Sequence, residues 1–269
     1  MNDTVISIDE LTKVYTIYKN ESDRLKGFIF PWCKGINVKA IDSVSLTVQS
    51  GEIIGFIGLN GSGKSTLSGI ISGITQPTSG DINIKGSVSM LSVNAGMMMK
   101  LSGRDNIYYK CLLLGFSKPQ IRAIEDKIIA FADIGLYIDQ PIRTYSTGMR
   151  SRLGFAISAH IDPDILVIDE ALVVGDGSFM EKCILRMREF VETGKTIIFV
   201  SHSPKQMEGF CTRVIWLHKG KIVGIGDTLD MLMAYEMFSK EWTTLTGEER
   251  ANIQPDFCAY LEIARASLF

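Results

Sequence analysis

The feature that most constrains this chain is a glycine-rich loop that directly follows a short apolar run. Residues 53–57, of sequence Ile-Ile-Gly-Phe-Ile, predict a buried strand, and residues 66–71 are consistent with a helix. Backbone N–H groups at such a helix start converge on one point, and the glycines leave room there for phosphate oxygens. The sequence therefore predicts a phosphate-binding loop made of Gly58, Leu59, Asn60, Gly61, Ser62, Gly63, Lys64, Ser65 and Thr66.

Two side chains at the end of this loop carry the chemistry of a nucleotide site. We expect Lys64 to reach the β- and γ-phosphates and the Ser65 hydroxyl to bind Mg²⁺. A plain glycine turn between a strand and a helix is the alternative for the loop taken by itself. The prediction of a bound nucleoside triphosphate therefore depends on finding the other parts of the site elsewhere in the chain.

Composition sets the outer limits of what the chain can be. With 269 residues, of which 46% are apolar, the chain can bury one substantial core, or one core and a smaller satellite. The net charge of −2 comes from 28 basic and 30 acidic residues and gives no overall basic field. This balance argues against a nucleic-acid partner.

The cysteines and the hydropathy pattern indicate the compartment. The five cysteines are scattered without metal-ligand spacing, which predicts buried thiols in a reducing compartment. No stretch approaches the roughly 18 apolar residues of a membrane span, and the start Met1-Asn2-Asp3-Thr4 lacks a secretory leader. We expect a cytoplasmic protein, so that any pore belongs to another chain.

The hydrophobic periodicity predicts an α/β fold. Strand-like runs occupy residues 5–8, 44–48, 52–57, 81–84, 88–91, 165–168 and 196–200. Between about residues 103 and 159 the apolar spacing is helical, with Ile121, Ile124, Ile128, Ile129 and Ala132 as examples, which predicts a helical insertion.

The last part of the chain follows the same pattern. A helix with Cys183, Met187 and Phe190 on one stripe separates the runs 165–168 and 196–200, which indicates a parallel sheet. Residues 215–217 and 222–225 predict a hairpin around Lys219-Gly220, and helices follow from Thr228. We expect the tail beyond about residue 236 to pack on the core or on a partner.

Further candidate groups lie at predicted strand ends, where parallel sheets bind ligands. Asp169, at the end of one apolar run, is suited to hold Mg²⁺, and Glu170 is suited to polarise the water that attacks the γ-phosphate. His202 follows another run and can hydrogen-bond the γ-phosphate or that water. Solvated acids and an ordinary loop histidine are the alternatives for these residues when each is taken alone.

The combined order of these elements resembles that of ABC-type ATPases, over roughly residues 4–232. The phosphate loop is followed by Tyr145-Ser146-Thr147-Gly148-Met149, then by Asp169-Glu170, then by His202. The resemblance implies a P-loop ATPase with a mainly parallel core sheet, an antiparallel β subdomain and an inserted helical subdomain. It implies a nucleotide-binding domain over residues 1–235, with the helical subdomain at about 97–160 and a C-terminal helical tail at 236–269.

The resemblance also implies that two copies of the chain share ATP and Mg²⁺. In that family the Ser-x-Gly segment opens a helix and binds the γ-phosphate of ATP held by a second subunit, and Ser146 and Gly148 match it. Tyr15 matches the aromatic residue that stacks on adenine, with a core tyrosine as the alternative, and Asp176 matches an acid that follows the catalytic glutamate. The chain is thus expected to act as a homodimer.

One departure from the family pattern concerns the second sheet strand. The family usually has a Gln after this strand as a contact for Mg²⁺ and water, whereas residues 88–94 here contain none. Ser92 and Asn94 are the possible substitutes. We assign the role to neither.

Local sequences resemble the ATP-binding subunits of polysaccharide exporters, particularly those of bacterial wall teichoic acid or O-antigen. They are residues 101–107, 145–150 and 170–176, and an extended segment whose Leu25, Phe28, Ile29 and Trp32 predict a short amphipathic helix. The implied function is a peripheral ATPase at the cytoplasmic face of the membrane, bound near residues 96–106 to a permease present in two copies. An O-antigen or capsular exporter, a soluble ABC ATPase, and a GTPase or small-molecule kinase are the alternatives.

Overall fold

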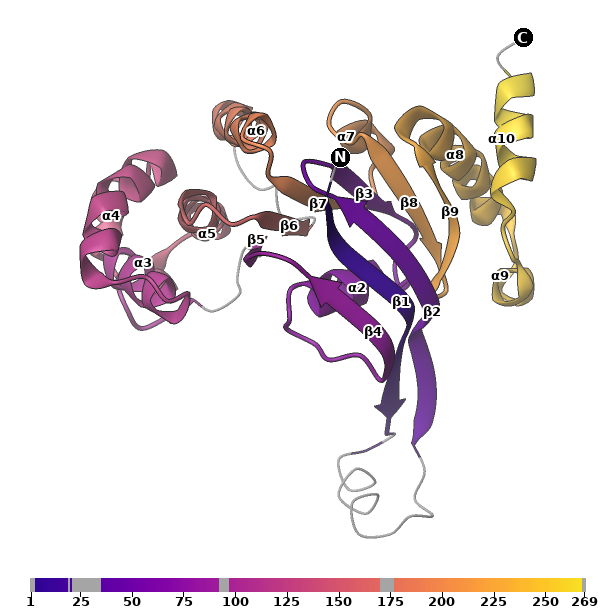
Figure 1. Cartoon of the computed structure of the whole chain (residues 1–269), viewed down its shortest axis with the longest axis horizontal. Helices are drawn as coiled ribbons and strands as arrows, with labels where there is room; N and C mark the ends of the chain where they lie inside the picture. The colour runs from indigo at the N-terminus through magenta and orange to yellow at the C-terminus, as the bar shows by residue number, and fades with distance from the viewer. Residues whose placement is uncertain (1–2, 19, 21–34, 92–96, 170–176, 268–269) are drawn as a thin grey trace. The chain divides into compact units, whose positions relative to one another are not determined.

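The computed structural model describes residues 3–18, 20, 35–91, 97–169 and 177–267 (Figure 1). The chain divides into two compact units. The first unit comprises residues 1–85 and 199–269, and the second unit comprises residues 86–198. Each unit is described by itself below.

An antiparallel sheet forms one part of the first unit. It has the order β2-β1-β4, with β1 (Thr4–Ile17) between β2 (Ile36–Gln49) and β4 (Ser79–Ile84). The alternating residues Ile6 and Ile8 of β1 are buried, as the period of a half-buried strand requires. The two long strands extend beyond the predicted runs because bulges let them bend without ending, and Glu10 at such a bulge has φ 44°.

A second set of strands leads to the predicted phosphate loop. β3 (Ile53–Ile57) is buried at every residue and pairs in parallel with β8 (Arg213–His218), which pairs antiparallel with β9 (Lys221–Asp227). The helix α2 (Lys64–Ile71) follows β3 after the loop, and α7 (Pro204–Glu208) precedes β8. The predicted hairpin is confirmed, since both Lys219 and Gly220 have positive φ, as a tight two-residue turn requires.

The C-terminal helices pack onto the first unit. They are α8 (Thr228–Thr244), α9 (Gly247–Asn252) and α10 (Phe257–Ala266), and Figure 1 shows α8 and α10 beside β8 and β9. The ring of Trp216 on β8 is fully buried and lies 5.1 Å from the ring centroid of Phe238 and 6.0 Å from that of Tyr260. These aromatic contacts join the tail to the sheet, and the expected boundary after residue 235 falls within α8.

The second unit is mainly helical, in accord with the predicted insertion. It contains α3 (Gly103–Leu113), α4 (Lys118–Ala132) and α5 (Thr147–His160), and two 3₁₀ turns, at Gly135–Asp139 and Ile142–Thr144, lie between α4 and α5. The predicted stripe on α4 packs inward, with Ile121, Ile128 and Ala132 buried and Ile124 and Ile129 against them. This cluster positions the start of α5.

The remaining elements of the second unit include a strand-helix-strand arrangement whose two strands, β6 and β7, are neighbours in one sheet. β6 (Ile165–Asp169) pairs in parallel with β5 (Val88–Leu91) and is followed by α6 (Gly177–Glu192) and β7 (Thr196–Val200), of which the last two residues belong to the first unit. The predicted stripe of α6 is buried, with exposed fractions of 1%, 3% and 2% for Cys183, Met187 and Phe190.

One expectation about the cysteines is wrong. Cys111, Cys183 and Cys211 are buried, but Cys258 is exposed, and Cys33 lies outside the described residues. The cause is the helical period of α10, which buries Tyr260 and Ala264 and turns Cys258 away from that face. Within the described residues, no helix combines the length and the apolar character needed to cross a lipid bilayer.

Candidate nucleotide-binding site

At two positions, the loop after β3 has a backbone conformation that only glycine adopts easily. Gly58 has φ 154° and Gly63 has φ 109°. A Cβ atom on Gly63 would lie 2.5 Å from the carbonyl oxygen of Ala40, and one on Gly58 would collide with the carbonyl oxygen of Leu217. The loop is therefore closely packed from behind, and its glycines are required by both conformation and space.

The first turn of α2 is open to an anion. Gly63 occupies the N-cap position of this helix, which is described throughout, and no side chain caps its backbone N–H groups. The first turn also holds no acidic residue. Because uncapped N–H groups at a helix start need an acceptor and the helix dipole is positive there, this turn fits a phosphate group.

Lys64 is held inside the loop rather than extended into solvent. Its side chain is only 7% exposed, and its ammonium group donates hydrogen bonds to the carbonyl oxygens of Gly58 at 2.6 Å and Leu59 at 3.0 Å. The Ser62 hydroxyl is buried and has no hydrogen-bond partner within the described residues. A buried cation and an unpaired hydroxyl beside an uncapped helix start fit the phosphates of a nucleotide.

Other predicted residues of the first unit lie as follows. Ser65 and His202 are exposed, and Ser201, next to His202, donates a backbone hydrogen bond to the carbonyl oxygen of Phe56 at 3.3 Å. The His202 segment therefore starts beside the strand that leads into the phosphate loop. Tyr15 on β1 is 40% exposed, with the Lys13 ammonium 5.1 Å from its ring centroid, so it is not a core tyrosine.

The second unit presents another helix start, at Ser146. This residue is exposed and is the N-cap of α5, where its Oγ accepts a hydrogen bond from the backbone N–H of Met149 at 3.2 Å, and Gly148 lies in the first turn. The preceding Tyr145 is buried, and its hydroxyl donates to the carbonyl oxygen of Tyr137 at 2.6 Å. Burial raises the pKa of Tyr145 to about 12, so this anchor stays protonated.

The expected Mg²⁺ ligands are a hydroxyl and a carboxylate. Asp169 is the last residue of β6, in the second unit, and Ser65 belongs to the first unit. Oxygen donors of this kind suit Mg²⁺, which takes its other ligands from phosphate and water. Glu170 and Asp176, as well as Ser92, Asn94 and the predicted amphipathic helix around Leu25, Phe28, Ile29 and Trp32, lie outside the described residues.

Comparison with known proteins decides the family. The family profile described as "ABC transporter" matches residues 41–173, a range that holds the phosphate loop, Ser146, Asp169 and Glu170. A protein of Staphylococcus saprophyticus named "Teichoic acids export ATP-binding protein TagH" is 44% identical over 251 residues, which cover 93% of this chain and 95% of that protein. The chain belongs to the TagH family.

Other members of the TagH family are longer. A protein of the same name from Bacillus cereus is 48% identical over 256 residues, which cover 95% of this chain but only 46% of that protein. The chain thus spans about half the length of its Bacillus relatives.

Solved structures confirm the predicted fold. A dimeric ATP-binding cassette in a post-hydrolysis state with ADP and Pi matches with a TM-score of 0.69 and 19% identity, covering 83% of this chain and 98% of that one. An ATP-binding subunit of an ABC transporter matches with a TM-score of 0.72 and 18% identity, covering 89% and 98%. This chain of the TagH family therefore has the α/β fold of an ABC ATPase.

The sequence did not reveal the residues that support the loop from behind. Ser62 accepts a hydrogen bond through its carbonyl oxygen from the backbone N–H of Gly220 at 2.9 Å, and Gly220 in turn accepts one from the N–H of Asp42 at 2.9 Å. The only signal in the sequence was the predicted turn at Lys219-Gly220, whose distance from the loop along the chain conceals this contact.

Proposed function

We propose that this chain is the ATP-hydrolysing subunit of an exporter that moves a lipid-linked cell-surface polysaccharide outward, most simply a teichoic acid. The observation that carries the proposal is the uncapped first turn of α2 beside the buried ammonium group of Lys64. The names of its TagH relatives supply the polymer. In this proposal the polymer passes through a separate membrane subunit. We therefore assign no residue of this chain to binding the polymer.

The residues divide the hydrolysis between them. Residues 58–66 would bind the triphosphate, and Ser65 and Asp169 would hold Mg²⁺, which would supply positive charge to neutralise the phosphates. Glu170 orients the attacking water and His202 contacts the γ-phosphate or that water. Tyr15 offers an exposed aromatic ring for adenine.

Hydrolysis in this proposal requires two copies of the chain. Ser146 and the first turn of α5 form a second helix start, suited to the γ-phosphate of ATP that the partner copy binds. A solved structure with the same fold is a dimer with ADP and Pi, which supports this arrangement. ATP binding would close the dimer and hydrolysis would open it.

Docking to the membrane subunit is assigned to the region near residues 96–106. Apolar side chains around it and along the following helices are exposed, among them Met98, Met99, Leu112, Leu113 and Leu136. A surface of this kind is typical of a protein–protein contact. The chain would then lie at the cytoplasmic face of the membrane without crossing it.

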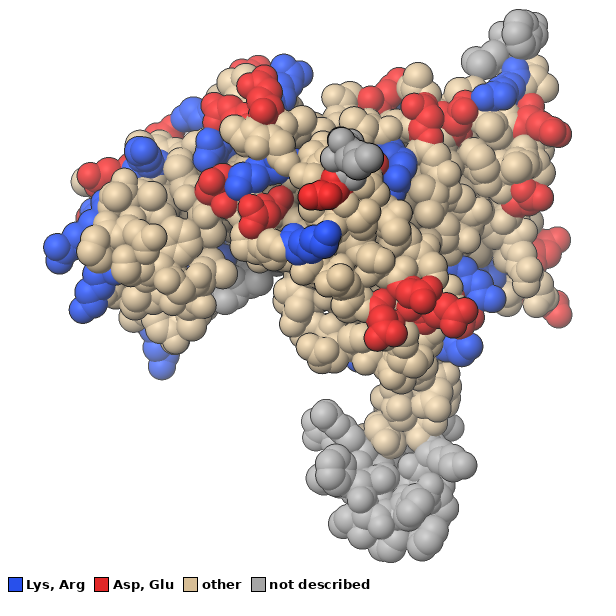
Figure 2. Space-filling view, in the orientation of Figure 1, with Lys and Arg blue, Asp and Glu red and all other residues tan. Residues whose placement is uncertain are grey.

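The first unit carries a charge pattern that disfavours a nucleic-acid partner. Asp9 on β1 pairs in register with Asp81 on β4, and both are exposed, as is Glu10. Figure 2 shows acidic side chains gathered over these strands. Such a surface repels phosphate backbones, in keeping with the proposed role at a transporter.

The test is a co-purification of the chain with a candidate membrane permease expressed together with it, in detergent, with and without ATP. We expect a complex, and we expect Met99→Asp to lower its affinity at least about tenfold. This is the usual effect of replacing a residue at the centre of an interface. Leu185→Asp on α6 is the matched control, since Leu185 is also exposed but lies outside the proposed surface. Absence of a complex in both conditions would refute the transport role.

A further inference from the structure

We infer that Lys219 is a positioning residue for the phosphate loop, and that it works by tying the end of α9 to the turn that supports Ser62. The inference rests on the proposed role of residues 58–66 in binding the triphosphate. It adds a residue from outside the loop, and a C-terminal segment, to the nucleotide site.

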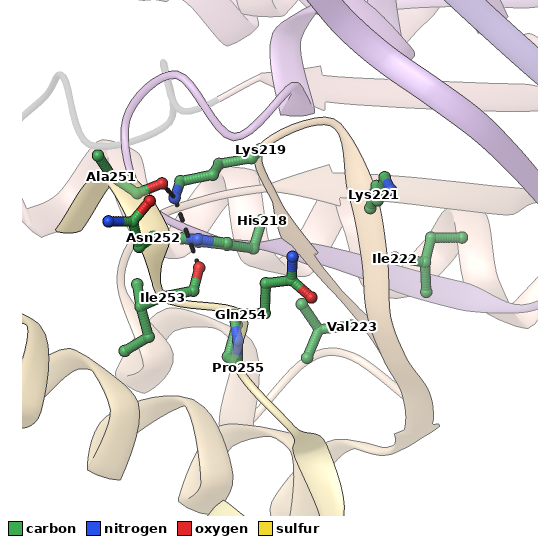
Figure 3. A pocket seen from close by; sticks show the side chains of 10 residues that line it. All are labelled: His218, Lys219, Lys221, Ile222, Val223, Ala251, Asn252, Ile253, Gln254 and Pro255. Carbon is green, nitrogen blue, oxygen red and sulfur yellow. Dashed lines mark hydrogen bonds between the residues drawn. The ribbon is translucent and has the colours of Figure 1, made fainter. Parts of the chain in front are cut away.

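The first link is between Lys219 and α9. The ammonium group of Lys219 donates hydrogen bonds to the carbonyl oxygens of Arg250 at 2.8 Å, Ala251 at 2.7 Å and Ile253 at 3.4 Å. Figure 3 shows the side chain reaching from the turn to this segment. The last carbonyl groups of a helix have no partner within it, so one cation satisfies several of them at once.

The end of α9 is itself fixed from the other side. The Arg250 guanidinium donates to the carbonyl oxygens of Trp242 at 3.1 Å and Thr243 at 3.3 Å, and it stacks 5.6 Å from the centroid of the Trp242 ring. That ring also packs against the ring of His218, at 5.6 Å between centroids. Lys219 is therefore bound to an anchored point rather than to a loose tail.

The second link is between the turn and the phosphate loop. Gly220 donates its N–H to the carbonyl oxygen of Ser62 at 2.9 Å, and its own carbonyl oxygen accepts from the N–H of Asp42 at 2.9 Å. A Cβ atom on Gly220 would lie 2.8 Å from the carbonyl oxygen of Ala40. The turn is thus wedged between the loop and β2, and a shift of the turn moves the Ser62 peptide with it.

A pocket explains why the lysine matters for this support. Between the turn and the α9–α10 connection the chain leaves a pocket of about 310 Å³, lined by His218, Lys219, Lys221, Asn252, Gln254 and others (Figure 3). The Nε2 atom of His218, which is 7% exposed, has no hydrogen-bond partner within the described residues. Because a pocket borders the turn on this side, the hydrogen bonds of Lys219 supplement the ring packing of His218 in holding the turn in place.

The consequence concerns nucleotide affinity more than the chemical step. Without the three donors of Lys219, the turn is free to move toward the pocket, and the Ser62 peptide loses its fixed position. The groups that orient water are not on this path. Loss of the support therefore raises the KM and the Kd for ATP and leaves kcat nearly unchanged.

The test compares two lysines of the same hairpin in the purified full chain. Lys219→Met keeps the aliphatic stem and removes the donors. Lys221→Met is its control, because the Lys221 side chain is 67% exposed and its one ion pair among the described residues is with Asp42, at 3.5 Å. We expect Lys219→Met to weaken ATP binding about fivefold, the value of one net hydrogen bond, measured by titration calorimetry. Lys221→Met stays within about twofold of the unmodified chain.

A conservative variant and a fold check complete the test. Lys219→Arg, which keeps several donors, restores affinity to within about twofold. Lys219 is exposed, so the unfolding temperature without nucleotide should change by less than about 5 °C. Equal affinities for Lys219→Met and Lys221→Met would overturn the inference, as would a Lys219→Arg chain that binds as weakly as Lys219→Met.

The failure of this inference can be told from failure of the proposed function. Lys64→Ala is measured in the same titration. If Lys64→Ala binds ATP normally, the loop is not the phosphate site and the proposed function falls. If Lys64→Ala loses affinity while Lys219→Met does not, only the role of Lys219 falls.

Discussion

The two helix starts that are proposed to face phosphate are built differently. At α2 in the first unit, Gly63 leaves the first N–H groups without a side-chain cap, and a buried lysine lies beside them. At α5 in the second unit, Ser146 caps its own helix through the N–H of Met149. The first start needs an anion to satisfy it, whereas the second is already satisfied and can only add to a site formed elsewhere.

The difference predicts that the two helix starts contribute unequally to the proposed binding of ATP. The α2 start should hold nucleotide in a single chain, and the α5 start should act only when a second chain brings a nucleotide to it. The variants below test the proposed roles of these two helix starts separately.

The largest effect is expected from Glu170→Gln. Loss of the carboxylate that orients water should lower ATP turnover by about 10²- to 10⁴-fold while both helix starts keep their phosphate contacts. We expect a trapped dimer with ATP, seen by light scattering. Glu192→Gln, an exposed residue on α6, is the control. Normal turnover, or a strictly monomeric ATP-bound form, would contradict the shared-nucleotide arrangement.

Lys64→Ala should come next, with ATP bound about 10- to 100-fold more weakly, because charged hydrogen bonds to phosphate are lost. This variant removes the ammonium group at the start of α2 and leaves the start of α5 unchanged. Calorimetry on the single chain measures it. An affinity equal to that of the unmodified chain would show that the buried ammonium group does not contact nucleotide.

Ser146→Ala tests the proposed role of the helix start of α5. Loss of the N-cap should cost about 1 kcal/mol of unfolding free energy and should weaken ATP-dependent dimer formation, with nucleotide affinity of the monomer unchanged.

Ser102→Ala is the matched control for that variant. Ser102 also caps its helix, α3, through the N–H of Asp105, and it forms a capping box with the Asp105 side chain, so its loss should cost at least as much stability. Chemical unfolding and light scattering separate the two outcomes. If Ser102→Ala impairs dimer formation as much as Ser146→Ala does, the effect of Ser146 is only structural.

The smallest effect is expected on stability at acid pH. Each unit contains one histidine that is half-buried or buried. Burial lowers the pKa of both His160, at the end of α5, and His218, behind the loop. The unfolded chain therefore binds more protons, and stability falls as the pH drops through 6.5, the ordinary value of a histidine.

Single substitutions show which unit is responsible for the loss of stability at low pH. His218→Asn should remove part of the acid sensitivity in the first unit, and His160→Asn part of it in the second, each followed by the midpoint of thermal unfolding against pH. An unchanged pH profile in both variants would show that neither burial contributes to acid sensitivity.

Most elements could be predicted from the sequence because their signals are local. The apolar run of β3 and the glycines after it predict a strand, a loop and a helix within neighbouring residues, and the stripes of Ile121 on α4 and Cys183 on α6 follow the helical period. The lengths of β1 and β2 were underestimated, since bulges at Glu10 and Ser43 carry the strands past the regular alternation.

What the sequence determined by itself is the glycine loop between β3 and α2 and the helix start at Ser146, because conformation and capping there depend on residues a few positions apart. Only the tertiary structure decided that Gly220 holds the Ser62 peptide, that Lys219 binds the end of α9, and that Cys258 faces solvent. These contacts join segments far apart in the chain. They follow from the packing of β8, β9 and α10, for which local sequence patterns carry no signal.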